Sequence, residues 1–503
     1  MVCARILSTG VFPMAVDFTK WTCRGTDRDR TCLYQNLYFA NGTLVAFVGP
    51  GDHHREFEPV QLCGTSRDWC KNYWMPARVP FDSLDELRSH VARLSVDTQS
   101  TLAVFFATFG DNNIGHALFD GLYPPYHALA KLGMQTEPFL PLLTGGSAAR
   151  ARSIYGQFAG RQAMHLDELK AKSWSWRFWR GWRAHATHFT QLVVGCGGVG
   201  NMYAEPDVAI GGHGHVMKSF RNRMWQAYGV SPMQPRTSKR TVDVVFVHNK
   251  RYSPNVLAAI NRTVSLINGR RYAHAEYIDW AHVGSGDYVA KFRAHLQRVS
   301  RADVYVSSIG TALQYVPFLR DQSVFVNVGT LWKREGRIFP CFMEQQLAGG
   351  GTPYLQTLYA DVHRALGTPE AVKMQGEYLV ALDEADLSAK IKLAIDLLSR
   401  PMSGKPSPYA NLSPEGHILA QLCHEQPDAC AKLTDSRNSL LNATLKGRAC
   451  RTMVWPEWPV YELAGWEMGA SGGCEGLNRN RLRQLRAKHG LPDLRLTYVG
   501  QAK

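Results

Sequence analysis

Two ionisable side chains stand four residues apart in DNNIGHALFDGLYPPYHALAKLG, residues 111–133. If this segment is helical, His116 and Asp120 lie on one face, and the carboxylate can hold the imidazole by a hydrogen bond. The pair suits general acid–base catalysis, because the ordinary pKa of histidine, about 6.5, lies near neutral pH. The same spacing occurs in surface pairs that stabilise a helix by about 0.2–0.5 kcal/mol. Spacing alone leaves both interpretations open.

Two other segments end an apolar run in residues that attract phosphate. VVFVHNKR, residues 244–251, ends in a histidine and two cations, and VYVSSIGTALQYVPFL, residues 304–319, passes from a predicted strand through a glycine into a predicted helix. Cations and the free N–H groups that begin a helix both favour bound phosphate. A solvated charge cluster and an ordinary strand–glycine–helix turn are the alternatives. The diphosphate site predicted from the two segments consists of His248, Lys250, Arg251, Ser308, Gly310 and Thr311.

The position of His116 and Asp120 depends on the strand that precedes them. TLAVFFATF, residues 101–109, is a short continuous apolar run, typical of a strand buried on both faces. The polar residues 111–113 follow it and can cap a helix, and Gly115 leaves room for another group to approach the backbone. Pro124 and Pro125 forbid a simple continuation of this helix and suit the first turn of a second one.

Strand and helix patterns alternate along much of the chain, which predicts an α/β fold with parallel sheets and crossover helices. We expect two doubly wound, Rossmann-like units that face one cleft, with ligands beyond the carboxyl ends of their strands. An alternating pattern around Asn41-Gly42 predicts a hairpin, and the Pro- and charge-rich stretch 231–241 predicts a linker. The four predicted parts are a cysteine-containing segment that packs on the first unit, 1–100; the first unit, 101–235; the second unit, 236–400; and an accessory tail, 401–503.

Composition restricts the class of protein. The 45% hydrophobic and 20% charged content argues against wholesale disorder, and the net charge of +15 predicts an anionic partner. No apolar run approaches the roughly 20 residues that span a membrane, and the N-terminus makes a poor signal peptide, so no membrane anchor is visible. The Trp- and Arg-rich stretch 174–188 is either core and solvated surface or a platform for bases, sugar rings or a membrane interface. The basic stretch 478–490 is a solvated helix face or an anion or membrane contact.

The eleven cysteines lie mainly near the two ends of the chain, five in the first 70 residues and four in the last 85. No pair has the Cys-x-x-Cys spacing of a zinc or redox site, so we expect disulfides and no metal. Disulfides form in oxidising compartments, and four Asn-x-Ser/Thr sequons, at Asn41, Asn261, Asn411 and Asn442, fit the same environment. These features predict a protein of the secretory pathway, in the Golgi or endoplasmic reticulum lumen.

Three segments resemble motifs of glycosyltransferase family 61. The motif Asn-x-x-His-x-x-x-Asp-Gly-Leu of that family is similar to Asn113–Leu122, and an upstream Cys-x-x-x-Asn-Leu is similar to Cys32–Leu37. A later strand that commonly ends in His-Gly-Ala-Gly-Leu resembles residues 306–319, where Ser308-Ile309 stands in place of His-Gly. Asn327 stands where an acidic residue is frequent, and Lys250 or Arg251 would replace the usual basic residue.

The resemblance implies a divergent inverting transferase of the GT-B type, with a nucleotide-sugar donor, most simply UDP-linked, and no essential metal. Its acceptor would be a hydroxyl of a glycan or glycoprotein. In a single displacement one general base deprotonates that hydroxyl, and His116, oriented by Asp120, is the expected base. The donor would bind at the predicted diphosphate site. A non-catalytic glycan- or polyanion-binding protein on the same scaffold is the alternative, and a nucleic-acid partner is not expected because no nucleic-acid module is recognisable.

Overall fold

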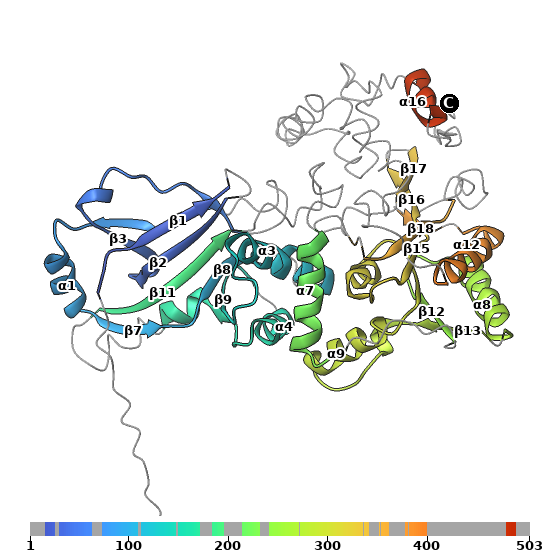
Figure 1. Ribbon diagram of the computed structural model, residues 1–503, viewed down its shortest axis with the longest axis horizontal. Coiled ribbons are helices and arrows are strands. Elements are labelled where there is room, and N and C mark those ends of the chain that lie inside the picture. Colours follow the sequence, from blue (N-terminus) through green and yellow to red (C-terminus); the bar gives the residue numbers. More distant parts are fainter. Residues whose placement is uncertain are drawn as a thin grey trace, which may run out of the picture.

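The computed structural model describes fifteen stretches of the chain: residues 16–25, 30–62, 73–108, 112–146, 149–171, 184–195, 214–231, 241–270, 272–334, 337–341, 352, 354–361, 378–380, 382–399 and 479–488. Asp111, the predicted linker, most of the Trp- and Arg-rich stretch and nearly all of the predicted tail lie outside these residues. The basic stretch of the tail is partly described, as helix α16 (Arg479–Lys488). The described residues form an α/β fold built on two large sheets (Figure 1).

The first sheet combines parallel and antiparallel strands. Its order is β10-β9-β8-β11-β2-β3-β6, with β1 paired to β2 and β7 paired to β11. Strands β7 to β11 pair in parallel, as predicted, but β2 joins β11 antiparallel, so strands from residues 1–100 belong to this same sheet and do not merely pack on it. The strands are β1 Lys20–Arg24, β2 Thr31–Ala40, β3 Thr43–Val48, β6 Ala77–Pro80, β7 Ser95–Gln99, β8 Ala103–Ala107, β9 Leu140–Thr144, β10 Met164–His165 and β11 His185–Gly195. The short β4 (Val60–Gln61) and β5 (Tyr73–Trp74) pair separately, and α1 (Leu84–Ala92) lies beside the sheet.

The predicted hairpin is present between β2 and β3. Ala40 pairs with Thr43, which leaves a two-residue loop of Asn41 and Gly42. Both loop residues have positive φ, 51° and 81°, as a type I′ turn requires. The sequence predicts disulfides without their pairing, and one is present: Cys23 and Cys32 face each other across β1 and β2 and are bonded.

This disulfide gives a first testable expectation. When the natively produced protein is denatured without reductant and alkylated, Cys23 and Cys32 should stay unmodified in peptide mass spectrometry. Replacing Cys23 by Ser should lower the free energy of unfolding by about 2–3 kcal/mol, because the unfolded chain regains the entropy of an open loop. Alkylation of both thiols in the native product would contradict the oxidised state and weaken the secretory-pathway prediction.

The second sheet is fully parallel among the described strands. Its order is β13-β12-β14-β15-β18, so the chain enters at β12, moves to β13 on one side, and then crosses back to β14 on the other. The carboxyl ends of the neighbouring strands β12 and β14 therefore form a topological switch point, where open α/β sheets bind ligands. The strands are β12 Val242–Val247, β13 Ala273–Ile278, β14 Val304–Ser307, β15 Val324–Asn327 and β18 Gln356–Tyr359. A small sheet of β16 (Thr330–Arg334), β17 (Arg337–Cys341) and β19 (Tyr378–Leu379) adjoins it.

Both faces of the second sheet are covered, which explains its continuous apolar strands. Helices α8 (Pro254–Asn268) and α12 (Glu384–Leu397) cover the face that carries Val244 and Phe246. Helix α9 (Tyr288–Val299) and the 3₁₀ helix η5 (Thr311–Phe318) cover the face that carries Val245 and Val247. The α8 start follows the sequence signal closely, with Ser253 as N-cap and proline in the first turn.

The element after β14 differs from the α-helix that the sequence predicts. Residues 311–318 form a 3₁₀ helix, and Pro317 lies inside it. Proline has no N–H to donate and its ring clashes with the carbonyl four residues earlier, which opposes an α-helix here. The first turn of η5, where the sequence predicts a phosphate contact, is therefore a 3₁₀ turn, which is narrower than an α-helical turn.

The helix that carries His116 and Asp120 is continuous but changes its winding. Helix α2 (Ile114–His116) passes into a π-helical turn, η3 (Ala117–Leu122), and then into α3 (Tyr123–Leu132). The two prolines stand at the start of α3, as predicted. They have no N–H to bond to the turn before them, and the Tyr123 N–H that precedes them bonds to the Leu118 carbonyl, five residues earlier, as in a π-helical turn.

The helices α3, α4 (Ala149–Ala159) and α7 (Gly214–Ala227) lie between the two sheets, against α9 and η5 (Figure 1). One hydrophobic cluster runs through this layer and includes side chains from both halves of the chain. At its centre the rings of Phe119, Phe220 and Phe318 lie 6.1–6.4 Å apart between centroids. This packing holds the helical segment that carries His116 against the second half of the chain.

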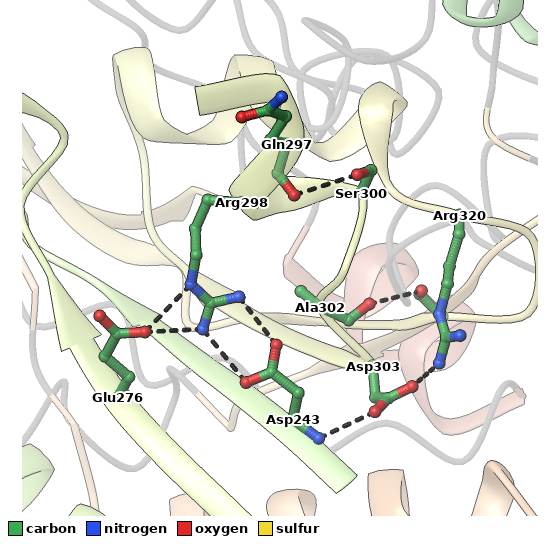
Figure 2. Close-up of polar contacts among 9 residues, drawn as sticks. Asp243, Glu276, Gln297, Arg298, Ser300, Ala302, Asp303 and Arg320 are labelled. Carbon is green, nitrogen blue, oxygen red and sulfur yellow. Dashed lines mark hydrogen bonds and ion pairs between the residues drawn. The ribbon is translucent and has the colours of Figure 1, made fainter. Parts of the chain in front are cut away.

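Two ion-pair clusters hold the amino ends of strands in the second sheet (Figure 2). Arg298 of α9 donates to both Asp243 and Glu276, at 2.8–3.1 Å. Asp303, which is fully buried, pairs with Arg320 and accepts a hydrogen bond from the backbone N–H of Asp243 at 2.8 Å. These groups lie at the end of the sheet opposite the switch-point turns, so we assign them to stability.

Candidate functional site

A pocket of about 670 Å³ lies at the switch point of the second sheet. Its walls come from both halves of the chain: the α2 start and α4 on one side, and the turns after β12, β13 and β14 with helices α9 and η5 on the other. This volume falls in the range of small-molecule sites. The pocket is therefore a candidate ligand site.

Five of the six residues predicted to bind a diphosphate line this pocket. They are His248, Lys250, Arg251, Gly310 and Thr311. The exception is Ser308, which is fully buried and donates its hydroxyl to the Gly329 carbonyl at 2.7 Å. Ser308 therefore supports the loop after β15 and does not line the pocket.

The turns after β12 and β14 are bonded to each other. Asn249 donates from its side chain to the Ile309 carbonyl at 2.6 Å and accepts from the Arg251 N–H at 3.0 Å. Arg251 also reaches the Ile309 carbonyl, at 3.4 Å. Gly310 has φ of 120°, and a Cβ there would lie 2.9 Å from Arg251 Nη1. Gly310 is thus required by its backbone conformation and by the approach of Arg251, where the sequence suggested the approach of a phosphate.

One ring nitrogen of His248 is hydrogen-bonded to a neighbouring hydroxyl. Its Nδ1 lies 2.7 Å from the Tyr277 hydroxyl. Burial raises the pKa of Tyr277 to about 12, so this hydroxyl stays protonated and can donate to Nδ1. In the tautomer in which Tyr277 donates to Nδ1, neutral His248 carries its proton on Nε2, which has no hydrogen-bond partner among the described residues. In this tautomer the ring presents a donor, which suits phosphate oxygens better than a role as base.

The other histidine that lines the pocket is engaged at both nitrogens. His295 Nε2 lies 3.1 Å from the Val283 carbonyl, and Nδ1 lies 2.7 Å from the Tyr315 hydroxyl. Burial lowers the pKa of His295. Its ring also contacts Trp280, whose ring stacks near Tyr315 at 4.5 Å between centroids. These aromatic residues form a rigid wall of the pocket and offer no free base.

The pocket wall opposite the β12 turn includes the start of α2, the helix start predicted from the sequence. This wall is hydrogen-bonded to η5. Asn113 caps α2 by accepting from the Gly115 N–H at 2.9 Å, and its side-chain oxygen also accepts from the Thr311 hydroxyl at 3.2 Å. A Cβ on Gly115 would lie 2.7 Å from Gln314 Cγ, so the close approach expected at this glycine is made by η5. Two motifs 198 residues apart in sequence thus meet at the pocket.

His116 and Asp120 form the expected pair. His116 Nδ1 lies 2.5 Å from Asp120 Oδ2, and their side chains are 30% and 6% exposed. The bond to Asp120 raises the pKa of His116, and burial raises the pKa of Asp120. Neither residue lines the pocket itself, but Asn113 and Ala117 on the same helical segment do. The sequence therefore predicted the bonded pair, while its position is at the edge of the pocket and not on its wall.

Several pocket residues escaped the sequence analysis. Arg150 and Lys291 line the pocket from within helices α4 and α9, where basic residues usually signal a solvated face. Asn249 lies two residues after β12 and Asp279 follows β13 directly, so the strand-end pattern that predicted Lys250 applies to both. Asp279 accepts from the Ala281 N–H at 2.9 Å and so caps the short helix η4 (Trp280–His282).

Within the described ranges, no three His, Cys, Asp or Glu side chains are arranged to hold a metal ion. In the same part of the chain, no helix has the length and apolar content to cross a membrane. No protein-family model matches the chain, and a comparison with curated proteins found no match.

Proposed function

We propose that this protein is an inverting glycosyltransferase of the GT-B type, a divergent relative of glycosyltransferase family 61, that moves a sugar from a nucleotide donor to a hydroxyl of a glycan or glycoprotein. The observation that carries the proposal is the pocket at the switch point, where His248, Lys250 and Arg251 come together with Gly310 and Thr311. The Asn113 motif bonds to this same group from the other wall. We propose that the secretory pathway is its location.

The donor diphosphate is assigned to the β12 turn. Lys250 and Arg251 supply positive charge, and His248 supplies an Nε2 proton, so the charge that develops on a departing diphosphate is stabilised by groups already in place. No essential metal is invoked, because these groups perform that part of the chemistry themselves. Four lysine and arginine side chains line the pocket against one carboxylate in its described wall, which supports an anionic ligand.

The base is assigned to His116, with Asp120 as its orienting partner. Asp120 accepts from Nδ1, and we assign Nε2 of His116 as the nitrogen that takes the acceptor proton. His248 and His295 are poor alternatives, since one presents a donor and the other is bonded at both nitrogens. Inversion follows from a single displacement with one base.

The function is tested in two steps on the full-length protein. UDP-sugars and other nucleotide sugars are first screened for an increase in melting temperature, and the best donor is then incubated with candidate acceptors while UDP release is measured. Acceptor-dependent release of the nucleotide is the expected result. A raised melting temperature without UDP release for any acceptor would favour the non-catalytic glycan- or polyanion-binding alternative. If no nucleotide sugar raises the melting temperature, the donor assignment is contradicted.

The diphosphate contacts give a separate prediction. Replacing Lys250 or Arg251 by Ala should weaken UDP binding by about 1.5–3 kcal/mol, the usual contribution of a hydrogen bond to a charged group. Gly310→Val should weaken it too, because the new side chain displaces Arg251. Isothermal titration with UDP measures each affinity, and Lys392→Ala, an exposed cation on α12 away from the pocket, is the matched control. Unchanged affinity in all three pocket variants would mean that the diphosphate binds elsewhere.

A further inference from the structure

The pocket has a second pair of cations besides those at the β12 turn. Arg150 comes from α4 and Lys291 from α9, so the pair spans the two halves of the chain. The Arg150 guanidinium lies over the Tyr288 ring, 4.2 Å from its centroid. Lys291 is three residues after Tyr288 and therefore adjoins it on the same face of α9. Tyr288 is one of the large apolar side chains that remain exposed.

Two neighbouring cations on the same two helices, Arg152 and Arg298, are neutralised by carboxylates, whereas the exposed Arg293 of α9, outside the pocket, has no ion pair within the described residues. Arg152 of α4 bonds to Glu168 at 2.5 Å, and Arg298 of α9 bonds to Asp243 and Glu276. In the described part of the chain, by contrast, Arg150 and Lys291 have no ion pair. Asp279, the carboxylate in the described pocket wall, already caps η4.

The charge of a nucleotide diphosphate does not account for this second pair. We have assigned the diphosphate to Lys250, Arg251 and His248 at the β12 turn, and these residues belong to strand-end turns rather than to the α4 and α9 helices. A neutral acceptor would leave Arg150 and Lys291 beside a ligand that uses neither charge. The planar fork of an arginine and the ammonium of a lysine together suit a carboxylate or sulfate group.

We infer that Arg150 and Lys291 recognise an anionic group, a carboxylate or a sulfate, on an acidic saccharide acceptor. This inference rests on the proposed function and names its acceptor class. The exposed ring of Tyr288, which contacts Arg150 and lies three residues before Lys291 on α9, offers an apolar surface to the sugar that carries the charge. Arg150 and Lys291 are thus specificity residues, and the transfer chemistry stays with His116 and the β12 turn.

The test uses three glycosides that differ only in charge: methyl β-glucoside, methyl β-glucuronoside and methyl β-glucoside 6-sulfate. Each is titrated into the full-length protein saturated with UDP. We expect at least one anionic glycoside to bind at least tenfold more tightly than the neutral one, and the better of the two identifies the group. The double variant Arg150→Gln/Lys291→Gln should lose this preference while it retains UDP binding, and Arg152→Gln should keep both.

Equal binding of the three glycosides to the wild-type protein would overturn the inference, as would a preference that survives the double variant. Failure of UDP to bind the wild-type protein would count against the proposed function instead. The same titrations without UDP then still decide whether Arg150 and Lys291 select an anionic saccharide. The single variant Arg150→Lys, which keeps the positive charge but lacks the planar guanidinium, should retain part of the preference that the double variant loses.

Discussion

Replacing His116 or Asp120 by Ala is expected to lower the turnover of sugar transfer by roughly 10²–10⁴, the usual contribution of a positioned acid–base group. UDP affinity should barely change, because the proposed diphosphate contacts lie on the other wall of the pocket. Steady-state kinetics with separate UDP titrations measure the two quantities. Asp120 is 4% exposed and bonded to His116, so its removal acts through the orientation and charge of the imidazole.

The pH profile separates this mechanism from a structural pair. A base must be neutral to accept a proton, and the bond to Asp120 raises the pKa of His116 above its ordinary value. Turnover should therefore fall as the pH drops through this raised pKa. In Asp120→Asn the bond to a carboxylate is lost, so the pKa of His116 falls and the acidic limb should move to lower pH.

Two further measurements complete the test: the turnover of the double variant, and that of a variant in another helical ion pair with the same spacing. If the two residues act as one unit, the double variant should be little slower than the slower single variant. Lys390 and Asp386 on α12 form another pair four residues apart, and Lys390→Ala should leave turnover unchanged. Full activity in both His116→Ala and Asp120→Ala would remove the catalytic assignment, and the pair would then be a stabilising contact only.

The sequence predicted those parts of the site that depend on one segment at a time. An apolar run followed by polar residues located the ends of β8, β12 and β14, and a spacing of four residues predicted the bond between His116 and Asp120. These features are local, since strand burial and helix periodicity act over a few residues. The α/β class followed from their alternation.

What the sequence did not predict depends on contacts between segments. The contact of Arg150 with Tyr288 is visible only when α4 is placed beside α9, and the burial of Ser308 and its bond to Gly329 depend on the loop after β15. The β2 strand, with Cys32 in it, joins the first sheet because β11 offers it an edge 152 residues away, as the contact between His188 and Asn36 illustrates. No local pattern specifies such pairings.

A second large effect is expected far from the pocket, at Arg320. Replacing Arg320 by Met should lower the free energy of unfolding by about 3–5 kcal/mol, because it leaves the buried Asp303 carboxylate without its cation. The other Asp303 oxygen accepts from the Asp243 N–H, so the backbone at the start of β12 and β14 is held by the same carboxylate (Figure 2). Urea denaturation followed by circular dichroism measures the loss.

Two further variants show whether buried charge is the cause. Arg262→Met breaks an ion pair with Glu384 whose side chains are 60% and 37% exposed, and it should cost no more than about 1 kcal/mol. The double variant Asp303→Asn/Arg320→Met removes both charges, while the amide oxygen of the introduced asparagine can still accept from the Asp243 N–H. It should therefore recover most of the stability that Arg320→Met loses. A double variant as unstable as Arg320→Met would show that arginine packing, and not the unpaired carboxylate, dominates at this position.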